Sequence, residues 1–236
     1  MPGPGSSQMP NTRIAARGLR RAFDDGRVEA LRGVDLDVTA GEFVAIQGPS
    51  GCGKTTLLQL LGALDQPGGG EVWFDGVPLD RIGDLAALRA RSIGFVFQAS
   101  HLLPTLSALE NVQIPMFEMP WSAAERERRA AVLLDAVGLA DRLHHRPAHL
   151  SGGERQRAAI ARSLANEPAC LLADEPTGNL DSVSAARVLD LIDTIHAERG
   201  LTILLVTHDA AVAGRATRVL RMLDGRIDAD QTAAPA

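Results

Sequence analysis

The chain has 236 residues, 45% of them apolar and 22% charged, so it is long enough for one α/β domain with a sizeable core. Its net charge of −5 gives no basic patch of the kind that favours nucleic acid as a partner, and its two cysteines are too few for a disulfide framework and favour a reducing cytosol. No stretch approaches the roughly 18 apolar residues of a transmembrane helix, so we expect any membrane span to belong to another chain.

Both ends of the chain are predicted to be disordered. Residues 1–12 are rich in Pro, Gly and Ser and have no apolar run, so they predict neither a signal peptide nor an anchor. A second disordered segment is predicted over 229–236. The remaining residues, 13–228, are expected to form a single folded domain.

The first half of the chain predicts strands around a glycine-rich loop. Apolar and polar residues alternate over 34–38, as in a half-exposed strand. A short apolar strand is predicted over 43–47, and a helix over 55–64 follows the glycine-rich loop. Further strand candidates lie at 72–74 and 93–97.

The middle of the chain, 99–165, is predicted to be mostly helical. Ser122 and Glu125 have the spacing of a capping box, which opens a helix to about Val137. Ser151 is expected to start another helix.

The last third returns to alternating strands and helices. The small apolar run 169–173 is typical of a parallel strand covered on both faces. A helix over 182–199, a buried strand over 202–206 and a hairpin over 219–227 are predicted after it. The alternation predicts an α/β fold with a mostly parallel sheet and a helical insertion near 99–165.

The glycine-rich loop is the most informative segment, because it contains Lys54, the only lysine among 24 Lys and Arg residues. A codon preference explains the shortage of lysine but not the position of this one. A compact ammonium can pass through a tight loop to the outer phosphates of a nucleotide, whereas a planar guanidinium is too wide. Backbone N–H groups of the loop and of the following helix would bind phosphate, and the Thr55 hydroxyl would ligate Mg²⁺. The alternative is a chance glycine turn, which the preceding strand disfavours. The predicted contacts to the nucleotide are Gly48, Pro49, Ser50, Gly51, Cys52, Gly53, Lys54, Thr55 and Thr56.

An acidic pair, Asp174 and Glu175, follows the predicted strand 169–173. A glycine-rich loop that binds phosphate is called a P-loop. An aspartate at the end of such a strand beside a P-loop can hold Mg²⁺, and Glu175 could then take a proton from an attacking water. In isolation the pair could equally be a cap at a strand end.

A second anion cradle is predicted where Ser151, Gly152 and Gly153 open a helix. The chain has only one lysine and one Asp-Glu pair to serve two cradles, so this one cannot form a complete nucleotide site. It is either a plain helix cap or half of a site that a second subunit completes.

These segments together resemble the nucleotide-binding subunit of ATP-binding-cassette (ABC) transporters. Six segments match the family's motifs in the family's order: Walker A at 48–55, the Q-loop at 97–98, the signature at 150–154, Walker B at 171–175, the D-loop at 179–181 and the switch histidine at 207–209. The resemblance implies a P-loop NTPase fold of the ABC type, with a mostly parallel sheet core, an antiparallel β part and a helical subdomain.

The resemblance also implies roles for single residues. Gln98 would reach Mg²⁺ or the attacking water, and His208 would contact the γ-phosphate. Asp181 would bridge two subunits, and the Ser151 cradle would bind the partner's γ-phosphate. Phe23 lies where the family places an aromatic that stacks on adenine, although a core phenylalanine is the alternative. The expected catalytic residues are Glu175, His208 and Gln98, and the expected Mg²⁺ ligands are Thr55, Gln98 and Asp174.

The implied cofactors are ATP and Mg²⁺, and the implied partners are a second copy, or a related ATPase subunit, and a separate transmembrane permease. The chain would then be cytoplasmic and peripheral on the inner face of the membrane. Segments 102–112 and 173–181 resemble the branch of lipoprotein-releasing, macrolide-export and cell-division ATPases. The apolar segments 102–106 and 115–121 could form a groove for a membrane subunit's coupling helix or pack within the helical subdomain. A non-transport ABC ATPase and an ATP-binding regulatory module stay open as alternatives.

Overall fold

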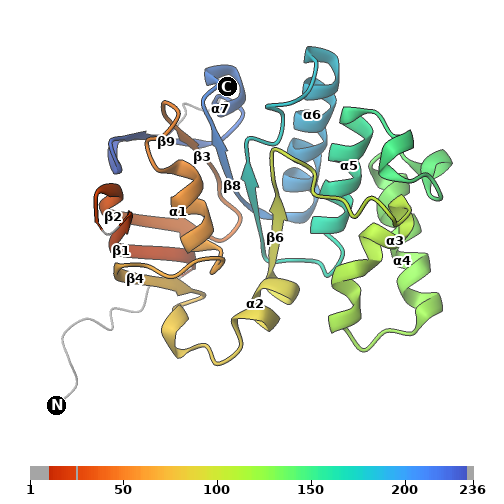
Figure 1. The fold of residues 1–236 in the computed structure, drawn as a ribbon, viewed down its shortest axis with the longest axis horizontal. Helices are drawn as coiled ribbons and strands as arrows, with labels where there is room; N and C mark the ends of the chain where they lie inside the picture. The colour runs from red at the N-terminus through yellow and green to blue at the C-terminus, as the bar shows by residue number, and fades with distance from the viewer. Residues whose placement is uncertain (1–10, 25, 233–236) are drawn as a thin grey trace.

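Two sheets organise the computed structural model, which describes residues 11–24 and 26–232 (Figure 1). The first sheet has the order β2-β1-β4-β5 and is antiparallel throughout. Its strands are β1 (Thr12–Phe23), β2 (Val28–Thr39), β4 (Gly69–Phe74) and β5 (Val77–Pro78).

The second sheet has the order β10-β9-β3-β8-β7-β6. It is parallel from β9 to β6, and only β10 is antiparallel to its neighbour. Its strands are β3 (Phe43–Gln47), β6 (Ile93–Val96), β7 (Cys170–Asp174), β8 (Thr202–Thr207), β9 (Arg218–Leu223) and β10 (Arg226–Thr232). The predicted mostly parallel sheet with an antiparallel part is thus confirmed.

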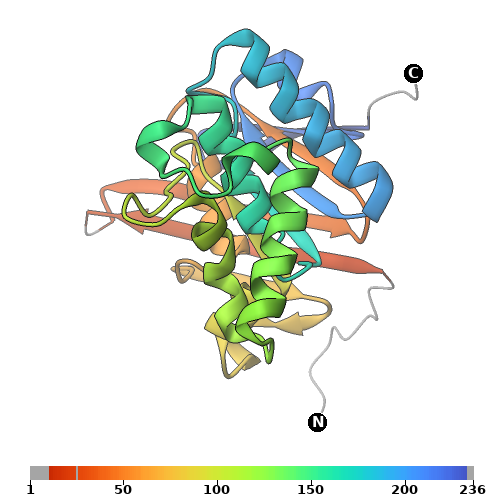
Figure 2. The ribbon, with the colours of Figure 1, turned by 90° about the vertical axis from the view of Figure 1, so that its right-hand side faces the viewer.

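Helices cover the second sheet and form a separate block beside it (Figures 1 and 2). The α-helices are α1 (Lys54–Leu61), α2 (Leu85–Ser92), α3 (Ala108–Gln113), α4 (Ala123–Ala136), α5 (Gly152–Ser163), α6 (Ser182–Arg199) and α7 (Ala210–Ala213). Short 3₁₀ turns are η1 (Leu79–Arg81), η2 (Ile114–Glu118), η3 (Ala140–Arg142) and η4 (Pro147–His149). In Figure 2 the green helices α4 and α5 lie in front of the strands. The predicted helical region near 99–165 corresponds to α3, α4 and α5.

The core has two parts because the central strands are covered on both faces. Phe43 and Ala45 of β3 pack with the helical block, whereas Val44 and Ile46 pack with α1 and the antiparallel sheet. This alternation follows from the two-residue period of a strand. β8 is buried at every position, as expected for a strand in the middle of a parallel sheet.

Both chain ends differ from the prediction where the structure describes them. Thr12, placed in the predicted lead, begins β1, and the predicted tail from 229 was wrong because β10 continues to Thr232. β9 offers this segment a pairing edge, and Arg218 binds the Asp230 carboxylate at 2.6 and 2.7 Å. The exposed, polar strand gave no apolar pattern to predict it from. Residues 1–10 and 233–236 lie outside the described residues.

One helix boundary and one helix cap also needed correction. α1 ends at Leu61, three residues before the predicted end, because Ala63 has a φ of 55°. Ser122 caps α4 as predicted, accepting from the Glu125 N–H, but the Glu125 carboxylate binds Arg128 and Arg129 and does not complete a capping box.

Among the described residues, no helix has both the length and the apolar character needed to cross a membrane.

Candidate nucleotide site

The P-loop between β3 and α1 is held in place by close packing of its backbone. Gly51 and Gly53 have φ values of 79° and 103°, which residues with a side chain rarely adopt. A Cβ at Gly48 would lie 2.2 Å from the Met222 carbonyl oxygen, and one at Gly53 would lie 2.3 Å from the Ala30 carbonyl oxygen. The neighbouring strands β9 and β2 therefore pack closely against the loop at Gly48 and Gly53.

Lys54 is almost fully buried in this loop. Its side chain is only 7% exposed, and its Nζ donates to the carbonyl oxygens of Gly48 and Pro49, both at 2.8 Å. The ammonium therefore lies against the inner side of the loop. Cys52 is a buried free cysteine whose Sγ lies 4.0 Å from the same Nζ.

Asp174, the last residue of β7, faces the first turn of α1. The Thr55 hydroxyl donates to Asp174 Oδ1 at 3.2 Å. Burial raises the pKa of the Asp174 carboxyl above its usual 3.8, and Glu175 adds to the rise, whereas the bond from Thr55 and the charge of Lys54 oppose it. The structure thus brings the predicted Mg²⁺ ligands Thr55 and Asp174 together.

Glu175 and His208 form a direct pair, because they follow the neighbouring parallel strands β7 and β8. His208 Nδ1 lies 2.7 Å from Glu175 Oε1. Glu175 has a φ of 47°, and its N–H donates to the Val206 carbonyl oxygen at 2.9 Å. A left-handed backbone at a residue with a side chain costs about 1–3 kcal/mol, and such residues occur at functional sites as well as in turns. The side chains of Glu175 and His208 are 17% and 61% exposed, so the pair can reach a ligand above the sheet edge.

Gln98 lies just beyond β6 and is tied to the loop that precedes α6. Its Nε2 donates to Asn179 Oδ1 at 3.4 Å, and Asn179 Nδ2 donates to the Gln98 carbonyl oxygen at 3.2 Å. Gly178 leaves room for this contact, since a Cβ there would lie 2.8 Å from Gln98 Nε2.

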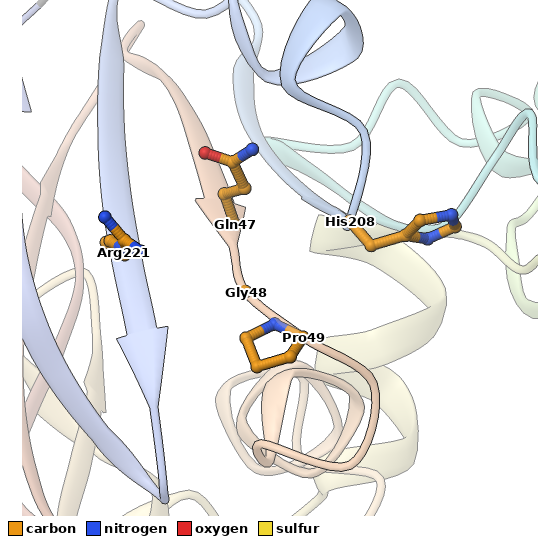
Figure 3. A pocket seen from close by; sticks show the side chains of 5 residues that line it. All are labelled: Gln47, Gly48, Pro49, His208 and Arg221. Atoms are coloured by element: carbon orange, nitrogen blue, oxygen red, sulfur yellow. The ribbon is translucent and has the colours of Figure 1, made fainter.

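A cavity of about 330 Å³ opens beside the first residues of the P-loop. Gln47, Gly48, Pro49, His208 and Arg221 line it, with Arg221 on β9 and His208 on opposite sides of Gln47 (Figure 3). Arg221 is therefore a second cationic side chain, besides Lys54, near the first residues of the P-loop.

The predicted second cradle is a helix cap in the single chain. Ser151 Oγ accepts from the Glu154 N–H at 3.2 Å, and the Glu154 carboxylate accepts from the Ser151 N–H at 2.8 Å. The cap packs against the segment that opens α6, since a Cβ at Gly153 would lie 2.9 Å from the Ser184 side chain. α5, which begins at this cap, and α1, which begins at the P-loop, stand well apart in Figure 1.

Phe23 and Asp181 have simple local surroundings. Phe23 ends β1, is 39% exposed and has the Arg21 guanidinium 5.0 Å from its ring centre. Asp181 caps α6 through Val183 and Ser184, and these N–H donors hold its pKa below the usual value. Both side chains are exposed at the surface of the chain.

The oxygen ligands beside the P-loop suit a Mg²⁺ ion that is bound together with nucleotide phosphates. Mg²⁺ takes one or two carboxylates together with substrate phosphates, and Asp174 and Thr55 supply hard oxygen atoms beside the P-loop. The side chain of Gln98, the third predicted ligand, is bound to Asn179. Within 11–24 and 26–232, no group of three or more His, Cys, Asp and Glu side chains could hold a metal by itself.

A lysine and a threonine in the P-loop after β3, an Asp-Glu pair at the end of β7, and a histidine directly after β8, the strand between β3 and β7, define a P-loop nucleoside triphosphatase. Comparisons with known proteins agree. The family model described as ABC transporter matches residues 31–178. The chain belongs to this family and is an ATP-binding, ATP-hydrolysing cassette.

The chain is similar to several ABC transporter proteins and to a solved ABC structure. It is 54% identical over 204 residues to an uncharacterized ABC transporter ATP-binding protein of Thermotoga maritima, covering 86% of this chain and 87% of that one. It is 50% identical to the macrolide export ATP-binding/permease protein MacB of Nitrosomonas europaea, covering 92% of this chain but spanning only 34% of that relative. The ATP-binding cassette MJ0796, solved as a dimer in a post-hydrolysis state bound to ADP and Pi, superposes with a TM-score of 0.87 at 38% identity, over 94% of this chain and 100% of that one.

Three side chains at the site were not predicted. Gln47 could have been considered, since it directly precedes Gly48. Asn179 lies in a matched motif, but its bonds to Gln98 depend on how two distant loops meet. Arg221 gave no signal, because it is one of many arginines and reaches the P-loop only through the pairing of β9 with β3.

Proposed function

We propose that two copies of this chain bind two Mg-ATP molecules between them, and that closure and opening of this dimer drive a separate transmembrane permease of an exporter. The observation that carries the proposal is the separation of two half-sites in one chain. The P-loop and Asp174 meet at the start of α1, whereas the Ser151 cap packs against 179–184 at the start of α6, and α1 stands apart from α5 and α6 in Figure 1. A twofold arrangement would bring each cap to the other chain's P-loop.

The dimer interface follows from the ends of α5 and α6. The first N–H groups of α5 have no partner within the helix and can bind an anion, and the Ser151 hydroxyl lies beside them. The Ser151 cap and Asp181 belong to one continuous surface, because Gly152 and Gly153 contact Leu180 and Ser184. A partner that accepts Ser151 would therefore also meet Asp181. MJ0796, which has the same fold, was solved as a dimer.

The chemistry at each site uses charge and position. Lys54 and the loop N–H groups bind the outer phosphates, and Phe23 stacks on the base. Glu175 accepts a proton from water as the water oxygen bonds to the γ-phosphorus and the bond to the β-γ bridging oxygen breaks, releasing ADP and phosphate. His208 is oriented by its 2.7 Å contact with Glu175, and its other ring nitrogen would contact the γ-phosphate. Thr55, Asp174 and Gln98 would hold Mg²⁺, which when bound neutralises charge on the phosphate oxygens.

A groove for the permease lies at the junction of α2, β6 and the helical block. It is a cavity of about 340 Å³ whose wall includes Leu64, Phe97 and Pro115. Leu64 is 44% exposed, and Phe117, close by in sequence to Pro115, is 66% exposed. The relatives named as export ATP-binding/permease proteins carry both functions in one chain, and this chain spans 34% of their length. These features support a permease partner and an export direction.

Co-purification of the tagged chain from solubilised membranes tests the partner. We expect a permease to co-elute, and we expect the purified complex to hydrolyse ATP faster than the chain alone. A chain that hydrolyses ATP but retains ribosomes or DNA, with no membrane protein, would contradict the proposal and favour a non-transport ATPase. A chain that binds ATP without hydrolysing it would favour a regulatory module.

A further inference from the structure

The backbone around Gln98 is held by side chains of α5, the helix that begins at the Ser151 cap. Gln156 Nε2 donates to the Phe97 carbonyl oxygen at 3.0 Å. Arg162 donates from Nη2 to the Ser100 carbonyl oxygen at 2.8 Å and from Nη1 to the His101 carbonyl oxygen at 2.7 Å. One helix therefore binds three carbonyl groups of a five-residue segment that contains Gln98.

Gln98 itself is bound from the other side of this segment. Its carbonyl oxygen accepts from Asn179 Nδ2 at 3.2 Å. The ring of Phe97 packs edge-on against the ring of His101, with centroids 5.4 Å apart. The segment 97–101 is thus closed on itself and fixed at both ends, so its position follows that of α5.

Water or another side chain could not easily replace the hydrogen bonds that Gln156 and Arg162 donate from α5. Gln156 is 2% exposed, so its amide cannot exchange the Phe97 carbonyl for water. Burial lowers the pKa of the Arg162 guanidinium, which still stays charged, and its planar fork reaches two adjacent carbonyls at once. A lysine would have to serve both acceptors from one nitrogen, so it cannot reproduce the two separate donors, Nη1 and Nη2, of the arginine fork.

We propose that Gln156 and Arg162 are positioning residues for ATP hydrolysis, which couple the signature helix α5 to Gln98. The inference rests on the proposed function, in which the N-terminus of α5 takes the partner's nucleotide and Gln98 serves the chain's own site. Because α5 is one rigid helix of 12 residues, its docking at one nucleotide sets the place of Gln98 at the other. Arg162 also lines the proposed permease groove, so an occupant of the groove would act on the same segment.

A double-mutant cycle tests this coupling. Arg162→Lys and Gln156→Glu remove donors to the 97–101 segment, and Gln98→Ala removes the side chain they position. Arg157→Lys is the matched control, since Arg157 lies on the same helix and also donates to two carbonyls, those of Val137 and Gly138, away from Gln98. Steady-state ATP hydrolysis, the Mg²⁺ concentration for half-maximal rate and binding of a fluorescent ATP analogue are measured for each.

We expect Arg162→Lys and Gln156→Glu to lower kcat about tenfold or more and to raise the Mg²⁺ requirement, as Gln98→Ala does, with the nucleotide Kd changed by less than about threefold. Arg157→Lys should leave kcat within about twofold of the wild type. Adding Arg162→Lys to Gln98→Ala should lower kcat little further, because both changes remove one unit. Losses that multiply, or a loss of nucleotide binding equal to the loss of kcat, would overturn the proposal in favour of a purely structural role.

Amide hydrogen exchange over 97–103 gives a readout that does not need hydrolysis. Arg162→Lys should speed exchange there, and Arg157→Lys should not. Unchanged exchange in Arg162→Lys would show that Arg162 does not hold segment 97–101, and it would overturn the proposal even in a chain that hydrolyses ATP normally. If the wild type shows no hydrolysis, the proposed function fails, and the exchange measurement still decides whether α5 holds this segment.

Discussion

Lys54→Arg keeps the positive charge of the P-loop but is expected to abolish useful nucleotide binding. Lys54 is 7% exposed, and its Nζ fits between two carbonyl oxygens of the loop at 2.8 Å each. The loop cannot widen for a guanidinium, because Gly48 already lies against the Met222 carbonyl. The arginine therefore has to leave the inside of the loop, and at least one charge-assisted bond to phosphate is lost. Such a bond contributes about 1.5–3 kcal/mol, so the Kd should rise about 10- to 150-fold.

Titration with a fluorescent ATP analogue measures this change, and thermal unfolding without nucleotide shows whether the variant is folded. Lys54→Met is the control for loss of charge and should bind as weakly as Lys54→Arg. A Kd for Lys54→Arg within about threefold of the wild type would refute the steric reasoning, because it would mean that a guanidinium serves the loop as well as an ammonium.

The remaining predictions concern the acidic pair. Glu175→Gln should bind ATP with a nearly unchanged Kd but release phosphate about 100-fold more slowly or worse, since the proton acceptor is lost; normal phosphate release would remove Glu175 as the base. Because burial raises the pKa of Asp174, the free protein binds this proton more readily than the unfolded chain, and the resulting stabilisation is present at low pH and lost as the pH rises through the folded-state pKa. Mg²⁺ competes with the same proton, so the Mg²⁺ concentration for half-maximal nucleotide binding should rise as the pH falls toward the raised pKa of Asp174, more steeply than in Asp174→Asn. An equal pH dependence in the two proteins would contradict this assignment.

Most of the fold could be predicted because the buried strands carry a clear signal. The continuous apolar runs at β3, β7 and β8 and the helix α6 with its closing glycine correspond to the predicted segments within a residue or two. β1 and α2 were missed, and β10 was predicted only as the short second arm of a hairpin ending at 227, since each owes its structure to a neighbour. β1 pairs with two strands, β10 adds to the edge of β9, and α2 has no buried residue of its own.

The site shows the same division. Local motifs named Lys54, Asp174 and Glu175, and the structure places them together because parallel strands end at one edge. What the sequence could not show is which contacts cross between motifs, such as Asn179 with Gln98 or Arg162 with His101. Those contacts join residues that are 81 and 61 positions apart, and only the packing of α5 and α6 brings them together.

Sedimentation velocity of Glu175→Gln at saturating Mg-ATP tests the shared nucleotide sites most directly. If each Ser151 cap completes the opposite P-loop site, this variant should sediment as a dimer with Mg-ATP and as a monomer without it, and Ser151→Arg in the same background should stay monomeric. A Glu175→Gln chain that binds Mg-ATP fully and still sediments as a monomer would contradict the account.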